Sequence, residues 1–287
     1  MATWITRTLR RLKISEQPPV VAVLRLNGTI GASGGVRPGL TMSTLAGPIS
    51  RLLADKTIAA AALVINSPGG SPVQAALIHD RVRLLAREKG IKVMTFAEDV
   101  AASGGYMLAL AGDEIYAHAN SIVGSLGVVS AGFGFDKLIE KIGVERRVHT
   151  SGERKAMLDP FQPEQPRDVA HLEALQKEVH ETFKTMVKER RAGKLKGEEN
   201  ELYSGAFWTG AKALEFGLVD GLGDLFAIAR AKFGSKVEFR VVTQRRSWFG
   251  WGGPSSRHAG GAPEAASWAH ELVVAIEDRA LWSRFGL

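Results

Sequence analysis

The sequence predicts an α/β protein with a mainly parallel sheet flanked by helices. Short apolar runs alternate with amphipathic helical segments, which is the pattern of repeated βαβ units. One run, residues 59–65, is almost continuously apolar, as expected for a strand buried on both faces. With 287 residues, 45% apolar and 23% charged, the chain is long enough to bury such a core without staples.

The predicted elements follow in chain order from the periodicity of the apolar residues. The expected strands are 20–26, 59–65, 91–96, 114–117, 122–129 and 145–150. The expected helices are 43–55, 73–88, 103–111, 133–142, 163–191, 208–216 and 225–233. The glycine-rich stretch 28–39 is expected to be a loop. Because ligands of parallel sheets bind at the carboxyl ends of the strands, the loops 67–71 and 98–105 are the first places to look for a site.

Four segments are expected along the chain: a basic N-terminal segment 1–19, a core domain 20–243, a Gly/Ser-rich linker 244–265 and a C-terminal helix 266–287.

The net charge is +7, and the excess of basic residues per residue of chain is greatest in residues 1–19. A nucleic-acid-binding domain would concentrate Lys and Arg on the folded body, so we do not expect nucleic acid as a partner.

The N-terminal segment has apolar residues, Trp4, Ile5, Leu9 and Leu12, near one helical face, with basic residues mostly elsewhere. Residues 1–17 could therefore contact an anionic membrane surface, or form a frayed tail or a helix docked on a partner subunit. No apolar run is long enough to span a bilayer, and the signal-peptide pattern is missing. The expected location is the cytoplasm, or the cytoplasmic face of the membrane as a peripheral protein.

The chain contains no cysteine, which excludes a disulfide scaffold, a thiol nucleophile and a Cys-based metal site. A serine could then act as the nucleophile. Ser103, at the start of a predicted helix, lies between small residues that leave its hydroxyl accessible, and the amide of Gly104 could face an oxyanion. The loop 67–70 could supply a second amide, from Gly70. Each motif also has a structural explanation, a helix N-cap for Ser103 and a strand-ending turn for Gly70.

A serine nucleophile needs a base. None of the seven histidines has an obvious acidic partner in the sequence. Lys155 follows a predicted strand and precedes a Pro-Phe turn. Burial could lower the pKa of a lysine from about 10.4 towards about 7 and make it a usable base, although most loop lysines are simply solvated.

Taken together and in order, five pieces resemble the signal peptide peptidase A (SppA/SohB) family of serine peptidases, with a ClpP/crotonase-like fold built from repeated ββα-type units. The pieces are Ser67-Pro-Gly-Gly, Ala102-Ser-Gly-Gly-Tyr106, Gly124-Ser-Leu-Gly-Val128, Ser151-Gly-x-x-Lys155 with Pro160-Phe161, and Trp208-Thr-Gly with Gly217-Leu-Val-Asp220. The resemblance spans about residues 20–230 and makes 20–243 the peptidase domain.

The resemblance implies a Ser–Lys dyad, with Ser103 as nucleophile and Lys155 as general base. It implies oxyanion-hole amides from Gly70 and Gly104, and Ser125 as the residue that positions the lysine. It implies no metal, no nucleotide and no other cofactor. The implied substrates are extended peptides, such as remnant signal peptides or membrane-protein fragments. The implied assembly is a ring-like homo-oligomer in which neighbouring subunits contribute to one site.

Three alternatives to the Ser–Lys peptidase were considered. A ClpP-type Ser-His-Asp mechanism would place a histidine within 121–142, where there is none. A crotonase-type acyl-CoA enzyme would share the oxyanion geometry but leave Lys155 without a role. A catalytically silent, membrane-associated scaffold of the same fold would leave both Ser103 and Lys155 unexplained. The Ser–Lys serine endopeptidase is therefore the function that the sequence favours.

Overall fold

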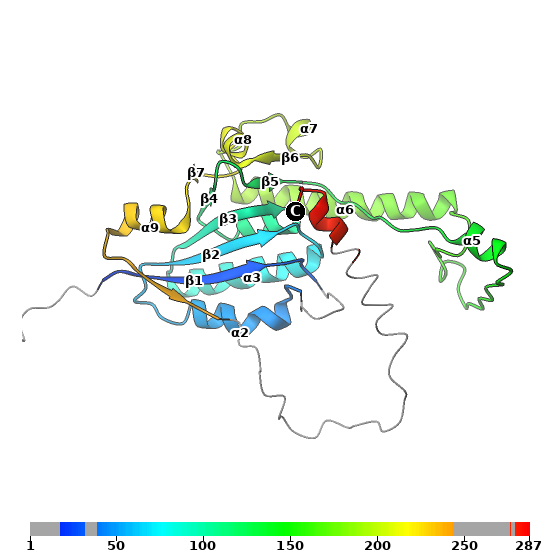
Figure 1. The fold of residues 1–287 in the computed structure, drawn as a ribbon, viewed down its shortest axis with the longest axis horizontal. Coiled ribbons are helices and arrows are strands. Elements are labelled where there is room, and N and C mark those ends of the chain that lie inside the picture. The colour runs from blue at the N-terminus through cyan, green and yellow to red at the C-terminus, as the bar shows by residue number, and fades with distance from the viewer. Residues whose placement is uncertain (1–17, 32–38, 244–275, 277–278) are drawn as a thin grey trace, which may run out of the picture.

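A mostly parallel sheet forms the centre of the protein in a computed structural model, which describes residues 18–31, 39–243, 276 and 279–287 (Figure 1). Within these residues the sheet has eight strands, in the order β6-β5-β3-β2-β1-β8, with β4 pairing β3 and β7. The strands are β1 (Val20–Asn27), β2 (Ala60–Ser67), β3 (Val93–Ala102), β4 (Glu114–Ala117), β5 (Ile122–Gly124), β6 (Phe207–Thr209), β7 (Gly221–Leu222) and β8 (Glu238–Val241). All pairs are parallel except β5 with β6.

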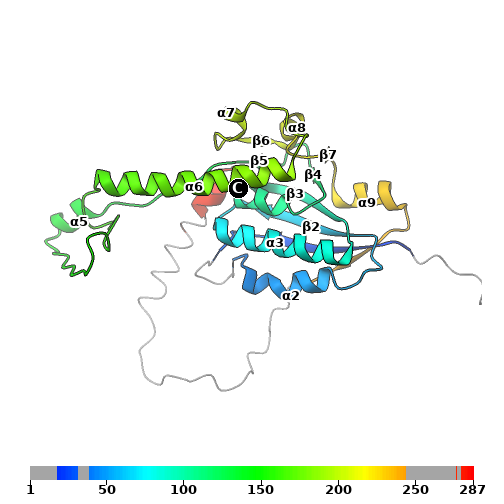
Figure 2. The ribbon, with the colours of Figure 1, turned by 180° about the vertical axis from the view of Figure 1, so that it is seen from behind.

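Helices cover both faces of this sheet. The helices of the described residues are α2 (Met42–Leu52), α3 (Pro72–Lys89), α4 (Gly104–Ala109), α5 (Asp136–Lys141), α6 (Pro166–Arg190), α7 (Glu199–Leu202), α8 (Gly210–Glu215) and α9 (Leu225–Phe233), of which α5 lies apart from the sheet. Seen from behind, α2 and α3 lie across one face (Figure 2). The predicted class, α/β with a mainly parallel sheet and flanking helices, is confirmed.

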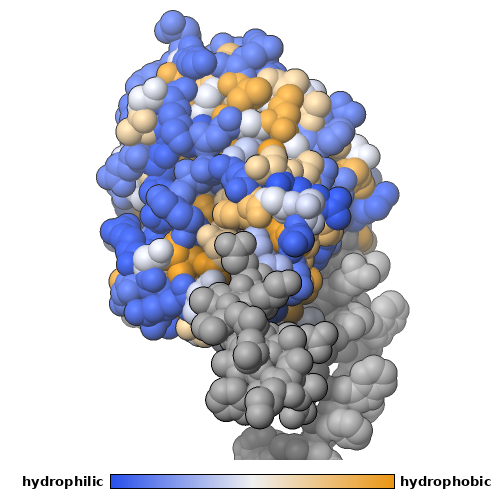
Figure 3. All heavy atoms as spheres, turned by 90° about the vertical axis from the view of Figure 1, so that its left-hand side faces the viewer, coloured by the Kyte–Doolittle hydropathy of each residue, from blue (hydrophilic) through white to orange (hydrophobic). Residues whose placement is uncertain are grey.

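The central strand β2 shows why the sheet forms. Its side chains alternate between two apolar clusters: Leu63 joins the cluster that contains α2, α3 and α4, and Val64 joins the cluster that contains α9. A strand buried on both faces must be apolar throughout, as residues 59–65 are. Figure 3 views the molecule from the left of Figure 1, where apolar side chains lie among a mostly hydrophilic surface.

The long strand β3 positions the candidate site. Its first part pairs with β4, from Met94 to Ala97, and its last part pairs with β5, from Val100 to Ala102. The pairing with β2 shifts register between these two parts. β3 therefore runs past its neighbours β2 and β4 and ends directly before Ser103.

One region projects from this body. Residues 128–165, which we call the arm, include α5 and the segments on both sides of it, and no residue in this range is buried. In Figure 1 the arm lies at the far end of α6, away from the sheet. The chain reaches it from β5 and returns through α6.

Most predicted elements are present with shifted ends, and two expectations are wrong. Residues 145–150 do not form a strand: they lie exposed on the arm, without a neighbouring strand among the described residues to take their hydrogen bonds. The segment 208–216 is not all helix, because its first residues pair with β5 as β6 before α8 begins. The strands β7 and β8 and the short helix α7 were not predicted.

Several expectations concern residues that the structure does not describe. The basic segment 1–19 lies outside the described residues except for its last two, and the linker 244–265 lies wholly outside. Of the predicted C-terminal helix, residues 276 and 279–283 are helical, and Phe285 packs against Phe207 with ring centroids 5.0 Å apart. None of the helices described here is long and apolar enough to cross a membrane.

Candidate active site

Ser103 sits at a sharp turn between β3 and α4. Its backbone has φ 53° and ψ −121°, a left-handed conformation that costs a non-glycine residue energy and persists only where the surroundings enforce it. Its amide donates to the carbonyl of Gly124, 2.8 Å away, in β5. Ser103 stands at the N-cap of α4, but its hydroxyl makes no capping bond with the helix. Ser103 therefore occupies the N-cap position without capping the helix through its side chain, and this half-buried residue makes no side-chain hydrogen bond within the described residues.

The loop after β2 presses against this turn through two glycines. A Cβ on Gly69 would lie 2.9 Å from the Cβ of Ser103 and 3.0 Å from the amide nitrogen of Gly104. A Cβ on Gly70 would lie 2.1 Å from the carbonyl oxygen of Ile30. Both glycines also have φ above +100°. Only residues without a side chain allow this approach, so the structure brings the 67–71 loop and Ser103 together.

The amides of Gly70 and Gly104 could serve an oxyanion. Gly104 opens α4, so its amide is one of the helix amides without an intrahelical partner. Within the described part of the chain, neither amide donates a hydrogen bond. Gly104 directly follows Ser103, and Gly70 lies in the loop that contacts it. These amides are therefore candidates for an oxyanion hole, in which donors are preorganised around the developing negative charge.

Ser125 lies near Ser103 in the fold. It is buried at 6% exposure and has a left-handed backbone, with φ 54°. Its amide donates to the carbonyl of Ala206, and it directly follows Gly124, which accepts from the Ser103 amide. Gly124 needs to be glycine because a Cβ there would lie 2.7 Å from the Trp208 ring. Ser125 is therefore held one residue away from the backbone partner of Ser103.

Lys155 is not part of this cluster within one chain. It is exposed and lies on the arm, whose hydrogen bonds are local: the amide of Phe135 donates to the carbonyl of Pro160, and Arg146 pairs with Asp159 at 2.8 Å. No hydrogen bond or ion pair among the described residues joins Lys155 to Ser103 or Ser125. The structure thus brings together four of the five predicted site residues and leaves the predicted base apart.

None of the histidines in the described part of the chain is hydrogen-bonded to Ser103. Of the seven, residues 258 and 270 lie outside the described part of the chain. His79 is buried on α3, and burial lowers its pKa, with the neighbouring Asp80 acting in the opposite direction. His180 on α6 donates from Nε2 to the carbonyl of Leu126 at 2.9 Å, since a carbonyl can only accept.

A cavity of about 450 Å³ lies elsewhere, on the α9 face of the sheet. Three of its polar lining residues have partners: Arg25 pairs with Glu98 at 2.6 Å, and Asp99 accepts from the side-chain amide of Asn66 at 2.6 Å. None of the five predicted site residues lines it. We therefore place the candidate site at Ser103 and not at this cavity.

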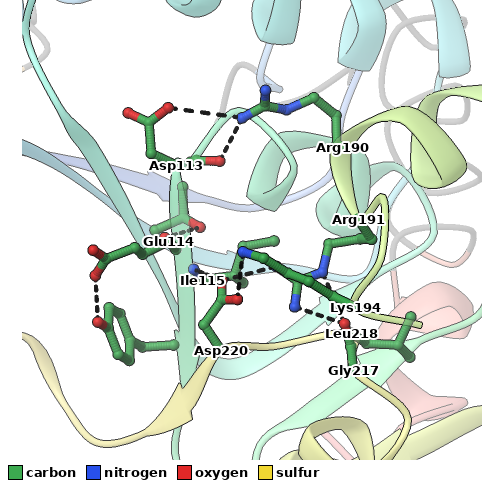
Figure 4. A network of polar contacts seen from close by, with 12 residues as sticks. Asp113, Glu114, Ile115, Arg190, Arg191, Lys194, Gly217, Leu218 and Asp220 are labelled. Atoms are coloured by element: carbon green, nitrogen blue, oxygen red, sulfur yellow. Dashed lines mark hydrogen bonds and ion pairs between the residues drawn. The ribbon is translucent and has the colours of Figure 1, made fainter. Parts of the chain in front are cut away.

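Sequence reasoning missed a polar network behind the site (Figure 4). Arg191, only 2% exposed, donates from Nε and Nη2 to the carbonyl of Gly217 at 2.8 and 2.6 Å, and from Nη1 to Asp220 at 2.8 Å. Tyr106 donates to the carbonyl of Leu218 at 2.7 Å. The Gly217-Leu-Val-Asp220 motif was noticed as part of the resemblance, but its partners lie too far away in sequence to be inferred.

Ser103 thus stands in a strained turn between a strand and a short helix, close to backbone amides that donate no hydrogen bond within the described residues. The profile of Peptidase family S49 matches residues 85–238, which is more than half of the chain. The chain belongs to peptidase family S49. The predicted family is thereby confirmed.

Similar proteins differ in length and printed name. The chain is 51% identical over 272 residues to a protein of Brucella melitensis named Na(+)/H(+) antiporter NhaA, covering 93% of this chain and 37% of that protein. It is 31% identical over 270 residues to the chloroplastic serine protease SPPA of Arabidopsis thaliana, covering 83% of this chain and 39% of that one. The chain thus spans well under half the length of these two relatives, and their names describe the longer proteins.

Two further comparisons are shorter or more distant. A putative protease of Synechocystis is 31% identical over 196 residues, covering 68% of each chain. Among solved structures, a membrane-bound stomatin-specific protease, 1510-N, is 14% identical with a TM-score of 0.48, covering 79% of this chain and 99% of that chain.

Proposed function

We propose that this protein is a serine endopeptidase that works with a Ser–Lys dyad, in which Ser103 is the nucleophile and Lys155 of a neighbouring subunit is the general base. The observation that carries the proposal is the strained Ser103 turn packed against Gly69 and Gly70. Strain of this kind is retained where function requires it. The unpaired amides of Gly104, next to Ser103, and of Gly70, in the contacting loop, support the proposal.

In the proposed reaction, neutral Lys155 accepts the hydroxyl proton of Ser103 while Oγ bonds to the carbonyl carbon of the scissile amide. The amides of Gly70 and Gly104 stabilise the oxyanion that forms. Collapse of the tetrahedral intermediate breaks the C–N bond of the scissile amide, and the leaving amine takes the proton from Lys155. Water then attacks the acyl-enzyme, with Lys155 again accepting a proton, and the acid is released as Ser103 recovers its hydrogen.

The arm supports a base supplied by another subunit. Its large apolar residues are exposed to a degree that is unusual for a monomer, and contiguous exposed apolar surface marks an interface. The exposed apolar residues on the arm are Val128, Val129, Phe133, Phe135, Leu138, Ile142, Val144, Val148 and Leu158. Contact with a second copy would cover this surface and take Lys155 out of water, which favours the neutral amine that can accept a proton.

We propose extended peptides as substrates, such as remnant signal peptides or fragments of membrane proteins. This specificity rests on family membership and on the access that glycine gives to the backbone near Ser103. Scanning a peptide library by mass spectrometry would identify the cut positions.

The test compares wild type with Ser103→Ala and Lys155→Ala, and with Lys141→Ala as a control that removes another exposed lysine of the arm. We expect cleavage by wild type and by the control only. A fluorophosphonate should label wild type and not Ser103→Ala. Full peptidase activity in either dyad variant would contradict the proposal.

Two other outcomes would favour the alternatives. An intact, folded oligomer that neither cleaves peptides nor reacts with the fluorophosphonate would favour a silent scaffold. Turnover of an acyl-CoA that survives Lys155→Ala would favour a crotonase-type enzyme.

A further inference from the structure

Helix α6 connects the arm to the body of the protein. It begins at Pro166, next to the arm, and ends at Arg190. Its apolar anchors, Phe183 and Val187, are buried in its second half. At 1.5 Å per residue, 25 residues span about 37 Å. The direction of α6 at its anchored end therefore determines where its other end, and the arm, will lie.

Arg190 bonds the C-terminal end of α6 to the end of α4 through hydrogen bonds. Its Nε donates to the carbonyl of Leu110 at 2.8 Å, and its Nη2 donates to the carbonyl of Gly112 at 2.7 Å. These carbonyls lie at and just beyond the C-terminal end of α4, where a cation is also favoured by the helix dipole. Ser103 precedes the other end of the same short helix. One residue of α6 thus holds the helix that carries the nucleophile.

Arg191 makes a second fastening one residue later. Its guanidinium holds the carbonyl of Gly217 with two donors and Asp220 with a third. Asp220 also accepts from the amide of Ile115 at 2.8 Å, and this bond connects the turn of residues 217–220 to β4. Gly217 cannot carry a side chain, because a Cβ would lie 1.8 Å from the carbonyl oxygen of Lys194.

Tyr106 connects this turn back to the nucleophile. It follows Ser103 by three residues, is fully buried, and donates to the carbonyl of Leu218 at 2.7 Å. Burial raises the pKa of Tyr106, so its hydroxyl keeps the proton that it donates. The turn 217–220 is thereby bonded both to the end of α6 and to the helix that follows Ser103.

We propose that Arg190 and Arg191 are positioning residues for catalysis: they hold α6 at a fixed angle to α4, so that the arm of one subunit presents Lys155 to Ser103 of the next. This rests on the proposed dyad between subunits. Over about 37 Å, a tilt of about 5° at the fastened end moves the far end by about 3 Å. A displacement of about 1 Å can cost about a hundredfold in rate, so a small loosening is enough to separate the dyad.

Arg190→Gln tests this while leaving the more buried Arg191 in place. Arg190 is partly exposed, with 24% of its side chain accessible, and Arg83 still donates to the carbonyl of Ala111 beside the end of α4. The matched control is Arg240→Gln, which removes an exposed ion pair with Asp55. Arg190→Lys keeps the charge but loses the two-donor geometry, and serves as the milder variant if Arg190→Gln does not fold.

The absence of cysteine allows the arm to be measured directly. Spin labels on Glu88→Cys in α3 and Lys137→Cys in α5, both exposed positions, report the distance from body to arm by double electron–electron resonance. Labelled chains are diluted with unlabelled chains so that only the distance within one chain is seen. This measurement needs no peptidase activity, so it can succeed or fail independently of the proposed function.

We expect a narrow distance distribution for wild type and for Arg240→Gln. For Arg190→Gln we expect a distribution broadened or shifted by about 3 Å, with kcat reduced at least about tenfold and KM within about twofold. Arg190→Lys should be intermediate in both measurements. An unchanged distribution in a folded Arg190→Gln or Arg190→Lys protein overturns the proposal, and so does a loss of kcat without any change in distance.

Discussion

Replacing Gly70 by alanine tests whether the backbone of the 67–71 loop takes part in the chemistry. The new Cβ would lie 2.1 Å from the carbonyl oxygen of Ile30 and 2.9 Å from its nitrogen. That carbonyl already accepts from the amide of Ser71 at 2.8 Å, so the obstacle is a hydrogen-bonded backbone and not a flexible side chain. The loop must move for alanine to fit.

The size of the effect follows from the distance. A hydrogen-bearing carbon such as Cβ contacts a carbonyl oxygen at about 3.3 Å or more, so a Cβ built 2.1 Å away requires the loop to shift by about 1 Å. The amide of Gly70 then moves away from the oxyanion. Loss of one oxyanion donor reduces kcat by about 10² to 10³, or about 2.7–4 kcal/mol. Alanine at a left-handed φ also costs about 1–3 kcal/mol of folding stability.

The assay is kcat on a fluorogenic peptide cut by the wild-type protein, with thermal unfolding measured in parallel. Gly90→Ala is the control, because Gly90 also has a positive φ, +67°, but a Cβ there meets nothing within 4 Å. We expect the control to lose some stability and to keep its kcat. A folded Gly70→Ala protein with kcat within about threefold of wild type would refute the role of this amide.

Further predictions concern stability and assembly. Leu63→Ala, at a 1% exposed position in β2, should destabilise the fold by about 2–5 kcal/mol. Asp220→Asn should lower the free energy of unfolding by about 1–3 kcal/mol at pH 7. Burial raises the pKa of Asp220, but the hydrogen bonds from Arg191, Lys194 and the Ile115 amide outweigh burial and lower this pKa overall. The charged Asp220 therefore contributes its full stabilisation above its unfolded-state pKa of about 3.9. This stabilisation is lost as the pH falls through the lower pKa that Asp220 has in the folded state. Phe133→Asp, at 72% exposure on the arm, should dissociate the oligomer.

Each of these predictions has a measurement that can contradict it. Urea unfolding should show Leu84→Ala, a 50% exposed leucine on α3, to be nearly neutral; an equal loss at Leu63 and Leu84 would refute the assignment of the core. The difference between wild type and Asp220→Asn should shrink below about pH 4, and a constant difference would exclude the charged pair. Light scattering should detect dissociation by Phe133→Asp and not by Leu84→Asp, and the reverse result would place the interface away from the arm.

The parts of the fold that were predicted well are the elements that can be recognised from their own residues, without knowing which elements they pack against. β2 is buried on both faces, so its composition alone identifies it. The helix predicted over 225–233 has its observed ends as α9, and the structure shows Asp224 capping its first amides. β6, β7 and β8 were missed because they are two to four residues long and are strands only through their neighbours. The segment 145–150 has strand-like composition but lies on the arm, where composition cannot supply a partner strand.

The features of the site also fall into those that the sequence could predict and those that it could not. Gly70, Ser103, Gly104 and Ser125 follow or join strand ends, and a parallel sheet gathers such ends at one edge, so their proximity could be predicted. The strain at Ser103 could not, because it arises from the β5 contact and the approach of Gly69. The separation of Lys155 also could not, since no local pattern indicates that the arm extends away from the body.

The most direct test of the account mixes two inactive proteins, Ser103→Ala and Lys155→Ala. After the subunits are exchanged in equal amounts, a site made from two neighbouring subunits is intact when its serine comes from the Lys155→Ala chain and its lysine from the Ser103→Ala chain. Random assembly in a closed ring makes about a quarter of the sites intact. We predict recovery of peptidase activity towards that fraction of wild type. No recovery in a verified mixed oligomer would contradict a dyad shared between subunits.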